Sequence, residues 1–161
     1  MFKVNGIIRL FGGLLCVFLF TQGQCFATPA AVDPKEVISA VELRELQLKK
    51  TRFIIFDARD KKSYDVGHIK DAVLPLDEDY YRQQELFRNG IIPTGPDPDK
   101  VLGQAMKKIK KNAQIVTYCN ANCGASKVLQ LKLVNLGYAN VRVMTEGYQV
   151  WEAKGYPVVK K

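Results

Sequence analysis

The sequence predicts an α/β fold, an open and mainly parallel sheet with helices on both faces. Continuous apolar runs at 53–56, 73–76 and 115–118 are the first reason, because such runs are typical of strands buried on both faces of a parallel sheet. Helical segments separate these runs, which implies parallel strands joined by right-handed crossovers. A further run, 141–144, predicts a strand nearer the edge of the sheet.

Two helices are predicted from their first residues. Ser39 and Glu42 have the spacing of a capping box, in which the hydroxyl and the carboxylate bind free backbone amides, so a helix is expected to about Leu48. Asp97 followed by proline is typical of a cap and a first helical residue, and it predicts a helix over 98–111.

A third helix, 126–136, is predicted to end at Gly137. It is expected to present one broad apolar face, formed by Val128, Leu129, Leu131, Leu133 and Leu136. In open α/β sheets, ligands bind beyond the carboxyl ends of the strands. The loop between 115–118 and this helix is therefore the first place to look for a site.

Residues 1–27 are predicted to be a secretory signal peptide. Lys3 and Arg9 precede an uncharged apolar run at 10–20, and small residues near Ala27 suit cleavage there. The run is much shorter than the roughly 20 residues that cross a bilayer, which favours a signal over a permanent span. Other cleavage sites with small residues are Ala30 and Ala31.

The remaining chain is predicted to be a short linker, 28–36, and one domain, 37–161. Export places this domain in the periplasm of a bacterium, with no stable membrane span after cleavage. Two alternatives stay open: an uncleaved signal that anchors the chain in the membrane, and lipidation at Cys25, whose preceding residues match a lipoprotein signal poorly.

The composition indicates a globular chain, with 47% hydrophobic and 25% charged residues and a net charge of +8. Many of the cations follow one another on the predicted polar face and end of a helix, at Lys107, Lys108, Lys110 and Lys111. No base-stacking aromatic residues are interleaved with them, so a nucleic-acid partner is not expected.

Only two of the four cysteines follow the predicted cleavage site, namely Cys119 and Cys123, which excludes a disulfide scaffold. Cys119 comes directly after the buried strand 115–118 and shortly before a helix. Backbone amides at a helix start lower the pKa of a thiol and stabilise a bound anion, so Cys119 is the candidate nucleophile. The alternative is a buried and inert cysteine at a strand end.

Two groups of residues, one in each half of the domain, carry a family resemblance. The first group is Phe56-Asp57-Ala58-Arg59, Tyr64, Gly67-His68-Ile69 and Ala72. The second group is Tyr118-Cys119, Ser126, Leu136-Gly137-Tyr138, Val141, Glu146-Gly147-Tyr148, Trp151 and Gly155-Tyr156-Pro157. In their order, and spread over most of 37–158, these residues resemble the rhodanese-like domains.

The resemblance implies a sulfurtransferase that needs no metal and no organic cofactor. Cys119 would take a sulfane sulfur from a small anionic donor such as thiosulfate, hold it as a persulfide, and pass it to cyanide or another thiol. Asp57 and Arg59 would pair to hold the strand-end loops, and His68 would be a structural residue in a loop after the first strand. Backbone amides would cradle the persulfide along Asn120, Ala121, Asn122, Cys123, Gly124, Ala125 and Ser126.

The loop departs from the family pattern in length and charge. Residues 119–125 form a loop one residue longer than is usual for sulfur transfer, as in relatives that handle phosphate or arsenate. Those relatives close the loop with an arginine that binds the oxyanion, where Ala125 stands here. A phosphatase would therefore lack its main charge partner, and a sulfurtransferase would lack the cation that many members place in the loop.

Cys123 is the second departure. The Cα atoms of Cys119 and Cys123 can come within the roughly 4.4–6.8 Å that a disulfide needs if the loop curls. Cys123 is then a candidate resolving thiol, which attacks a Cys119 persulfide and releases sulfide. The alternative is a structural thiol.

Two other function classes remain open. The domain can be a catalytically silent binding module, which the missing loop cation favours, or a thiol-disulfide redox protein that uses Cys119 and Cys123. The sequence indicates no oligomeric state.

Overall fold

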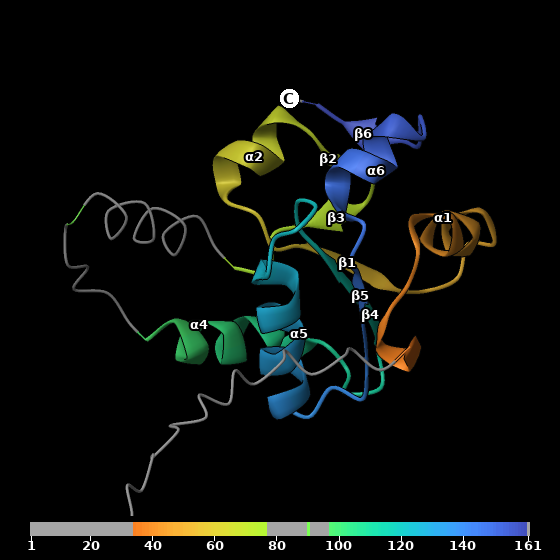
Figure 1. Cartoon of the computed structure of the whole chain (residues 1–161). Helices are drawn as coiled ribbons and strands as arrows, with labels where there is room; N and C mark the ends of the chain where they lie inside the picture. Colours follow the sequence, from red (N-terminus) through yellow and green to blue (C-terminus); the bar gives the residue numbers. More distant parts are fainter. Residues whose placement is uncertain (1–33, 77–89, 91–96, 161) are drawn as a thin grey trace, which may run out of the picture. The chain divides into compact units, whose positions relative to one another are not determined.

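A parallel four-stranded sheet in the order β3-β1-β4-β5 forms the centre of the domain (Figure 1). The computed structural model describes residues 34–76, 90 and 97–160, so the predicted signal peptide lies outside the described residues. The strands of this sheet are β1 (Ile54–Asp57), β3 (Ala72–Val73), β4 (Gln114–Tyr118) and β5 (Asn140–Met144). The parallel α/β fold predicted from the apolar runs is confirmed.

Helices cover both faces of this sheet, as predicted (Figure 1). The α-helices are α1 (Ala40–Leu48), α2 (Lys61–Val66), α4 (Pro98–Ala105), α5 (Ala125–Asn135) and α6 (Gly147–Ala153), and the 3₁₀ turns are η1 (Pro34–Glu36) and η2 (Met106–Lys108). No helix within the described ranges is long and apolar enough to cross a bilayer.

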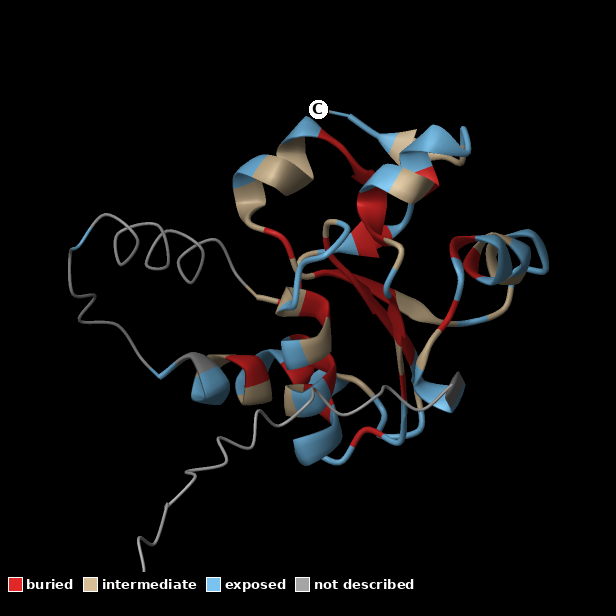
Figure 2. Ribbon diagram, viewed as in Figure 1, coloured by how far each residue is buried: buried red, intermediate tan, exposed pale blue. Residues whose placement is uncertain are grey.

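Each face of the sheet has its own hydrophobic core. Leu43 of α1 and Trp151 of α6 pack with Ile55 and Val116 on one face. Leu102 of α4 packs on the other face, together with α5 residues. Neighbouring residues of a strand therefore point to opposite cores, which is why the strands are continuous apolar runs. Figure 2 shows the strands and the inward sides of the helices as buried.

The strand predicted at 73–76 begins one residue earlier and is only two residues long, as β3 (Ala72–Val73). Its register places Ala72 beside Ile55 of β1. The predicted edge strand is β5, but the chain before α1 also lies along it: Val37 bridges Val143, and the Ile38 amide donates to the Val143 carbonyl at 3.0 Å. The edge of the sheet is thus covered by the N-terminal part of the domain itself.

The helix predicted over 98–111 ends early, as α4 followed by η2. Asp97 caps it as predicted, since its carboxylate accepts from the Asp99 amide at 2.9 Å. Beyond Ala105, the hydroxyl of Tyr138 donates to the Met106 carbonyl at 2.5 Å. This contact joins residues far apart in the sequence and occupies a carbonyl that a longer α-helix would use.

Only the serine half of the predicted capping box is present at α1. The Ser39 hydroxyl accepts from the Glu42 amide at 3.0 Å, whereas the Glu42 carboxylate pairs with Arg142 at 2.6 Å. Glu146, from the segment before α6, accepts from the Ala40 amide instead. The carboxylate of Glu146 thus binds a free backbone amide at the start of α1, as had been predicted for the carboxylate of Glu42.

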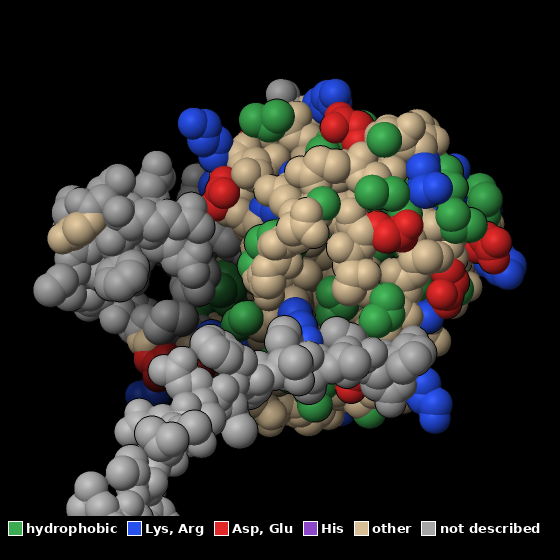
Figure 3. Space-filling view, viewed as in Figure 1, with side chains coloured by type: hydrophobic (Ala, Val, Ile, Leu, Met, Phe, Trp, Pro, Cys, Tyr) green, Lys and Arg blue, Asp and Glu red, His purple; other side chains and the backbone are tan. Residues whose placement is uncertain are grey.

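The prediction that α5 has one broad apolar face buried in the core is wrong in part. Leu129 and Leu133 are buried against the sheet, but Val128 and Leu131 are 52% and 53% exposed. The helix contacts the sheet along one side only, so apolar residues on its other side meet solvent. On the face drawn in Figure 3, acidic and basic side chains are interspersed over the described surface.

Candidate active site

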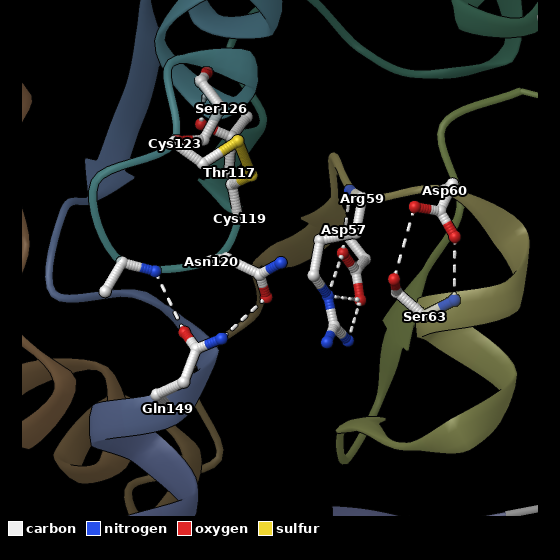
Figure 4. The surroundings of a disulfide bond; sticks show 11 residues. Asp57, Arg59, Asp60, Ser63, Thr117, Cys119, Asn120, Cys123, Ser126 and Gln149 are labelled. Atoms are coloured by element: carbon white, nitrogen blue, oxygen red, sulfur yellow. Dashed lines mark hydrogen bonds and ion pairs between the residues drawn. A yellow bond between two sulfur atoms is a disulfide. The ribbon is translucent and has the colours of Figure 1, made fainter. Parts of the chain in front are cut away.

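The loop between β4 and α5 lies at the carboxyl edge of the sheet, where the sequence predicted a ligand site. Cys119, its first residue, is 2% exposed, while Cys123 is exposed. A disulfide joins the two residues, with Cα atoms 6.1 Å apart, within the range predicted for a curled loop (Figure 4). Gly124 then caps α5, and Ala125 is the first helical residue.

The loop curls because of one residue with a left-handed backbone. Asn122 has φ 60°, a conformation that asparagine adopts more readily than most residues. The Cys123 amide donates to the Asn120 carbonyl at 3.2 Å and closes the turn. The turn brings Cys123 back over Cys119, which makes the disulfide possible.

Gln149 of α6 holds the loop from outside it (Figure 4). Its side-chain oxygen accepts from the Ala121 amide at 2.9 Å, and its side-chain nitrogen donates to the Asn120 side chain at 3.0 Å. The amides of Ala121 and Cys123 therefore each donate a hydrogen bond within the protein when the disulfide is present. Sequence reasoning missed Gln149, because only its place after Gly147 and Tyr148 of the second motif hinted at a role.

Gly147, the first residue of α6, packs directly under the same loop. It has φ +81°, and a Cβ atom there would lie 2.3 Å from the Ala121 nitrogen and 2.6 Å from the Asn120 carbonyl carbon. The next amide, of Tyr148, donates to the Cys119 carbonyl at 2.8 Å. The start of α6 thus fixes the position of the backbone that carries Cys119.

The variant Gly147→Ala is expected to destabilise the domain more than Gly155→Ala, by about 1–3 kcal/mol measured by chemical unfolding. Both glycines have positive φ, so both variants include the same backbone strain. At Gly155, however, a Cβ meets no described atom within 4 Å. Equal losses of stability in the two variants would contradict the close packing of Gly147 against the loop.

Asp57 and Arg59 form a buried ion pair at the end of β1, next to β4. The Arg59 Nη2 atom lies 2.6 Å from the Asp57 Oδ2 atom, and the two side chains are 5% and 0% exposed. Arg59 Nη2 also donates to the Gly67 carbonyl at 2.6 Å. Burial opposes the charge of Arg59, but the hydrogen bond and charge of Asp57 outweigh it and raise the pKa of Arg59.

Tyr118 connects this pair to the cysteine loop, since it directly precedes Cys119. Its hydroxyl donates to Asp57 at 2.5 Å and accepts from the Ile69 amide at 3.2 Å. Burial and, next, the negative charge of Asp57 raise the pKa of Tyr118 far above its ordinary value. Tyr118 therefore stays neutral, and its hydroxyl joins β4 to β2 (His68–Ile69) by a hydrogen bond.

His68 lies in β2 and not in the loop predicted for it, because β2 pairs with β6 (Val158–Val159). The His68 Nδ1 atom is 2.9 Å from the Tyr64 carbonyl oxygen, and its ring stacks on the Tyr64 ring at 3.7 Å. These contacts are those of a buried structural residue. Ser126, at the other end of the loop, is also buried, and its carbonyl accepts from the Thr117 hydroxyl at 3.0 Å.

The site thus combines a buried cysteine at a strand end, a second cysteine bonded to it, and a helix that begins just after them. Among the described residues, no three histidine, cysteine or acidic side chains are grouped so that they can hold a metal ion. The chemistry that this part of the structure offers is that of the two sulfur atoms.

Solved structures of other proteins share the fold of this chain. A rhodanese-like domain from Anabaena sp. superposes with a TM-score of 0.57 and 21% identity, over 78% of this chain and 80% of that one. A Bacillus halodurans protein superposes with a TM-score of 0.57 and 20% identity, over 78% and 77% of the two chains. A thiosulfate sulfurtransferase from Pseudomonas aeruginosa gives 0.54 and 16%, over 78% of this chain but only 20% of its own length.

No curated protein matches the chain significantly. The structural likenesses, all at low identity, show the fold. The family model described as the rhodanese-like domain matches residues 39–154, which is most of the chain. By this match the chain belongs to the rhodanese-like domain family.

Proposed function

We propose that this chain is an exported sulfurtransferase that carries sulfane sulfur on Cys119. The observation that supports it best is the position of Cys119, at the carboxyl end of a buried strand and bonded to a residue next to the start of α5. A helix start favours the thiolate over the thiol, and the thiolate is the nucleophile. The same partial charge favours an anionic donor such as thiosulfate.

In the first step, the Cys119 thiolate of the reduced protein attacks the outer sulfur of thiosulfate. The sulfur-sulfur bond of thiosulfate breaks, and sulfite leaves with the electron pair. A persulfide remains on Cys119. Arg59 is engaged by Asp57 and by the Gly67 carbonyl, so donor binding depends on backbone amides of the loop.

In the second step, the Cys123 thiolate attacks the Sγ atom of the Cys119 persulfide. The bond to the outer sulfur breaks, hydrosulfide leaves, and the Cys119–Cys123 disulfide forms. Two external thiols then reduce this disulfide and are oxidised to one disulfide of their own. The balance is one thiosulfate and two thiols consumed, with one sulfite, one sulfide and one disulfide produced.

This balance is the test of the proposal. The reduced full chain with thiosulfate and glutathione should release sulfite, sulfide and oxidised glutathione in equal amounts, while Cys119→Ser should release none above the buffer rate. Sulfite without sulfide would contradict the resolving role of Cys123. Equal rates in the wild type and in Cys119→Ser would contradict sulfur transfer through Cys119.

The disulfide also favours a second candidate function, thiol-disulfide exchange without sulfur transfer. In that case the protein should exchange with external thiols and disulfides but leave thiosulfate unchanged. A binding module remains the third candidate, and it would show neither reaction at a useful rate. The thiosulfate assay and a measured reduction potential separate the three.

Export is part of the proposal, because disulfides persist outside the cytosol. N-terminal sequencing of the protein from cell fractions should find a mature chain in the periplasm that begins near Thr28. An intact N-terminus in the membrane fraction would instead indicate the uncleaved anchor.

A further inference from the structure

The two residues that the disulfide joins are exposed to solvent very unequally. Cys119 is 2% exposed, as the residue that continues the buried strand β4. Its carbonyl is held by the Tyr148 amide at 2.8 Å, and the start of α6 lies against the two residues that follow it. Cys123, by contrast, is exposed. One sulfur therefore belongs to the residue that faces the protein interior, and the other to a residue that faces solvent.

The residues around Cys123 leave it open to a reactant. Ala121, Asn122 and Gly124 are exposed, and all three are small. The loop from Cys119 to Ser126 contains no charged side chain. A thiol of low mass, or one carried on a protein surface, meets no bulky or like-charged loop side chain on its way to this sulfur.

In thiol-disulfide exchange, this difference in exposure decides which of the two cysteines an external thiol attacks. A thiolate attacks one sulfur of a disulfide from behind, along the line of the bond that breaks, and access decides which sulfur is attacked. A nucleophile that attacks Cys119 would have to reach a residue that is 2% exposed. A nucleophile that attacks Cys123 has to reach a residue that is exposed to solvent.

We propose that an external thiol opens the disulfide by attacking Cys123, and that Cys123 is the site of a mixed disulfide with that thiol. The bond from the thiol sulfur to Cys123 Sγ forms, the Cys119–Cys123 bond breaks, and Cys119 leaves as a thiolate. A second thiol then attacks the sulfur of the first, which forms the external disulfide and frees Cys123. Two electrons pass from the two thiols to the protein disulfide.

The environment of Cys119 suits it to be the leaving group. Its sulfur is bonded to Cys123, which directly precedes the Gly124 cap of α5, an 11-residue helix whose first amides carry partial positive charge. A thiol with a lowered pKa leaves faster than an ordinary one. The inference joins the proposed function at one point, because the thiolate that the first thiol releases is the one proposed to accept sulfur.

Glutathione is the probe for the direct test. The oxidised full chain is mixed with glutathione for increasing short times, free thiols are blocked with N-ethylmaleimide, and the loop peptide is analysed by tandem mass spectrometry. At the earliest times, glutathione should be on Cys123 and the maleimide on Cys119, in about tenfold excess over the opposite isomer or more. The opposite isomer, equal amounts of both, or a disulfide that glutathione does not open would overturn the proposal.

A charge variant tests the direction of approach independently. Asn122→Asp adds a negative charge beside Cys123 at a position whose backbone aspartate tolerates, and it should slow the attack of anionic glutathione by about twofold or more at low salt. Asn135→Asp, at the exposed C-terminal end of α5, changes the net charge equally and should not slow it. Equal rates in the two variants would contradict approach from the Cys123 side.

A protein dithiol can supply the same attack, and a second arm of the experiment distinguishes this source. A reduced thioredoxin that retains only its attacking cysteine should form a stable mixed disulfide with Cys123. A stable adduct on Cys119 instead would overturn the proposal. Neither experiment includes a sulfur donor, so both test the inference apart from sulfur transfer. If a thiol adduct forms on Cys123 but thiosulfate produces no persulfide on Cys119, this inference stands and the proposed sulfur transfer fails.

Discussion

Replacing Arg59 with methionine is expected to lower the free energy of unfolding by about 3–5 kcal/mol. The substitution leaves Asp57 as a buried carboxylate that has lost its ion pair, and it leaves the Gly67 carbonyl without the hydrogen bond from Arg59. Urea unfolding followed by the fluorescence of Trp151, the single tryptophan and fully buried, measures this loss.

The exposed ion pair of Lys132 with Asp99 supplies a matched control. Its side chains are 37% and 66% exposed, so Lys132→Met should cost less than about 1 kcal/mol. Adding Asp57→Asn to Arg59→Met removes the isolated charge and should recover part of the lost stability. A loss in Arg59→Met no larger than in Lys132→Met would contradict a structural role for the buried pair.

Replacing Cys119 with serine is expected to abolish sulfite release from thiosulfate, a loss of about three orders of magnitude or more. Serine keeps the shape of the residue but its hydroxyl is not ionised at neutral pH, so it cannot accept a sulfur atom as a thiolate does. The assay compares the initial rates of sulfite formation in the reduced wild type and in the variant.

Cys123→Ser is the control, since it removes the same disulfide and retains the nucleophile. It should accept sulfur from thiosulfate but should not release sulfide in the absence of an external thiol. Retention of sulfite release in Cys119→Ser, or its loss in Cys123→Ser alone, would show that Cys119 is not the sulfur carrier.

The fold was predictable because its strands are buried on both faces. Residues such as Ile55 and Phe56 belong to opposite cores, so a strand needs no polar alternation and appears as an apolar run. The ends of the elements were less predictable. The hydroxyl of Tyr138 donates a hydrogen bond to the Met106 carbonyl at the point where α4 ends and η2 begins. No local sequence pattern near Met106 indicates this contact with a tyrosine 32 residues away.

The place of the two cysteines in the fold, and the approach of one to the other, were predictable from the sequence. A cysteine between a buried strand and a helix has a position that sequence alone defines, and the spacing to Cys123 allows the disulfide. The parts that hold the loop come from α6 and become neighbours only in the folded chain. Gln149 and Gly147 act through the Ala121 and Asn120 backbone, and nothing in their own surroundings in the sequence specifies that contact.

The central claim is that Cys119 carries sulfur, and the intact mass of the protein tests it most directly. The reduced full chain, its Cys119→Ser variant and its Cys123→Ser variant are each treated with thiosulfate and measured without reductant. The account predicts a gain of one sulfur atom in Cys123→Ser, none in Cys119→Ser, and conversion of the wild type to the disulfide with release of sulfide. A sulfur gain in Cys119→Ser, or no gain and no sulfide in any of the three proteins, would contradict it.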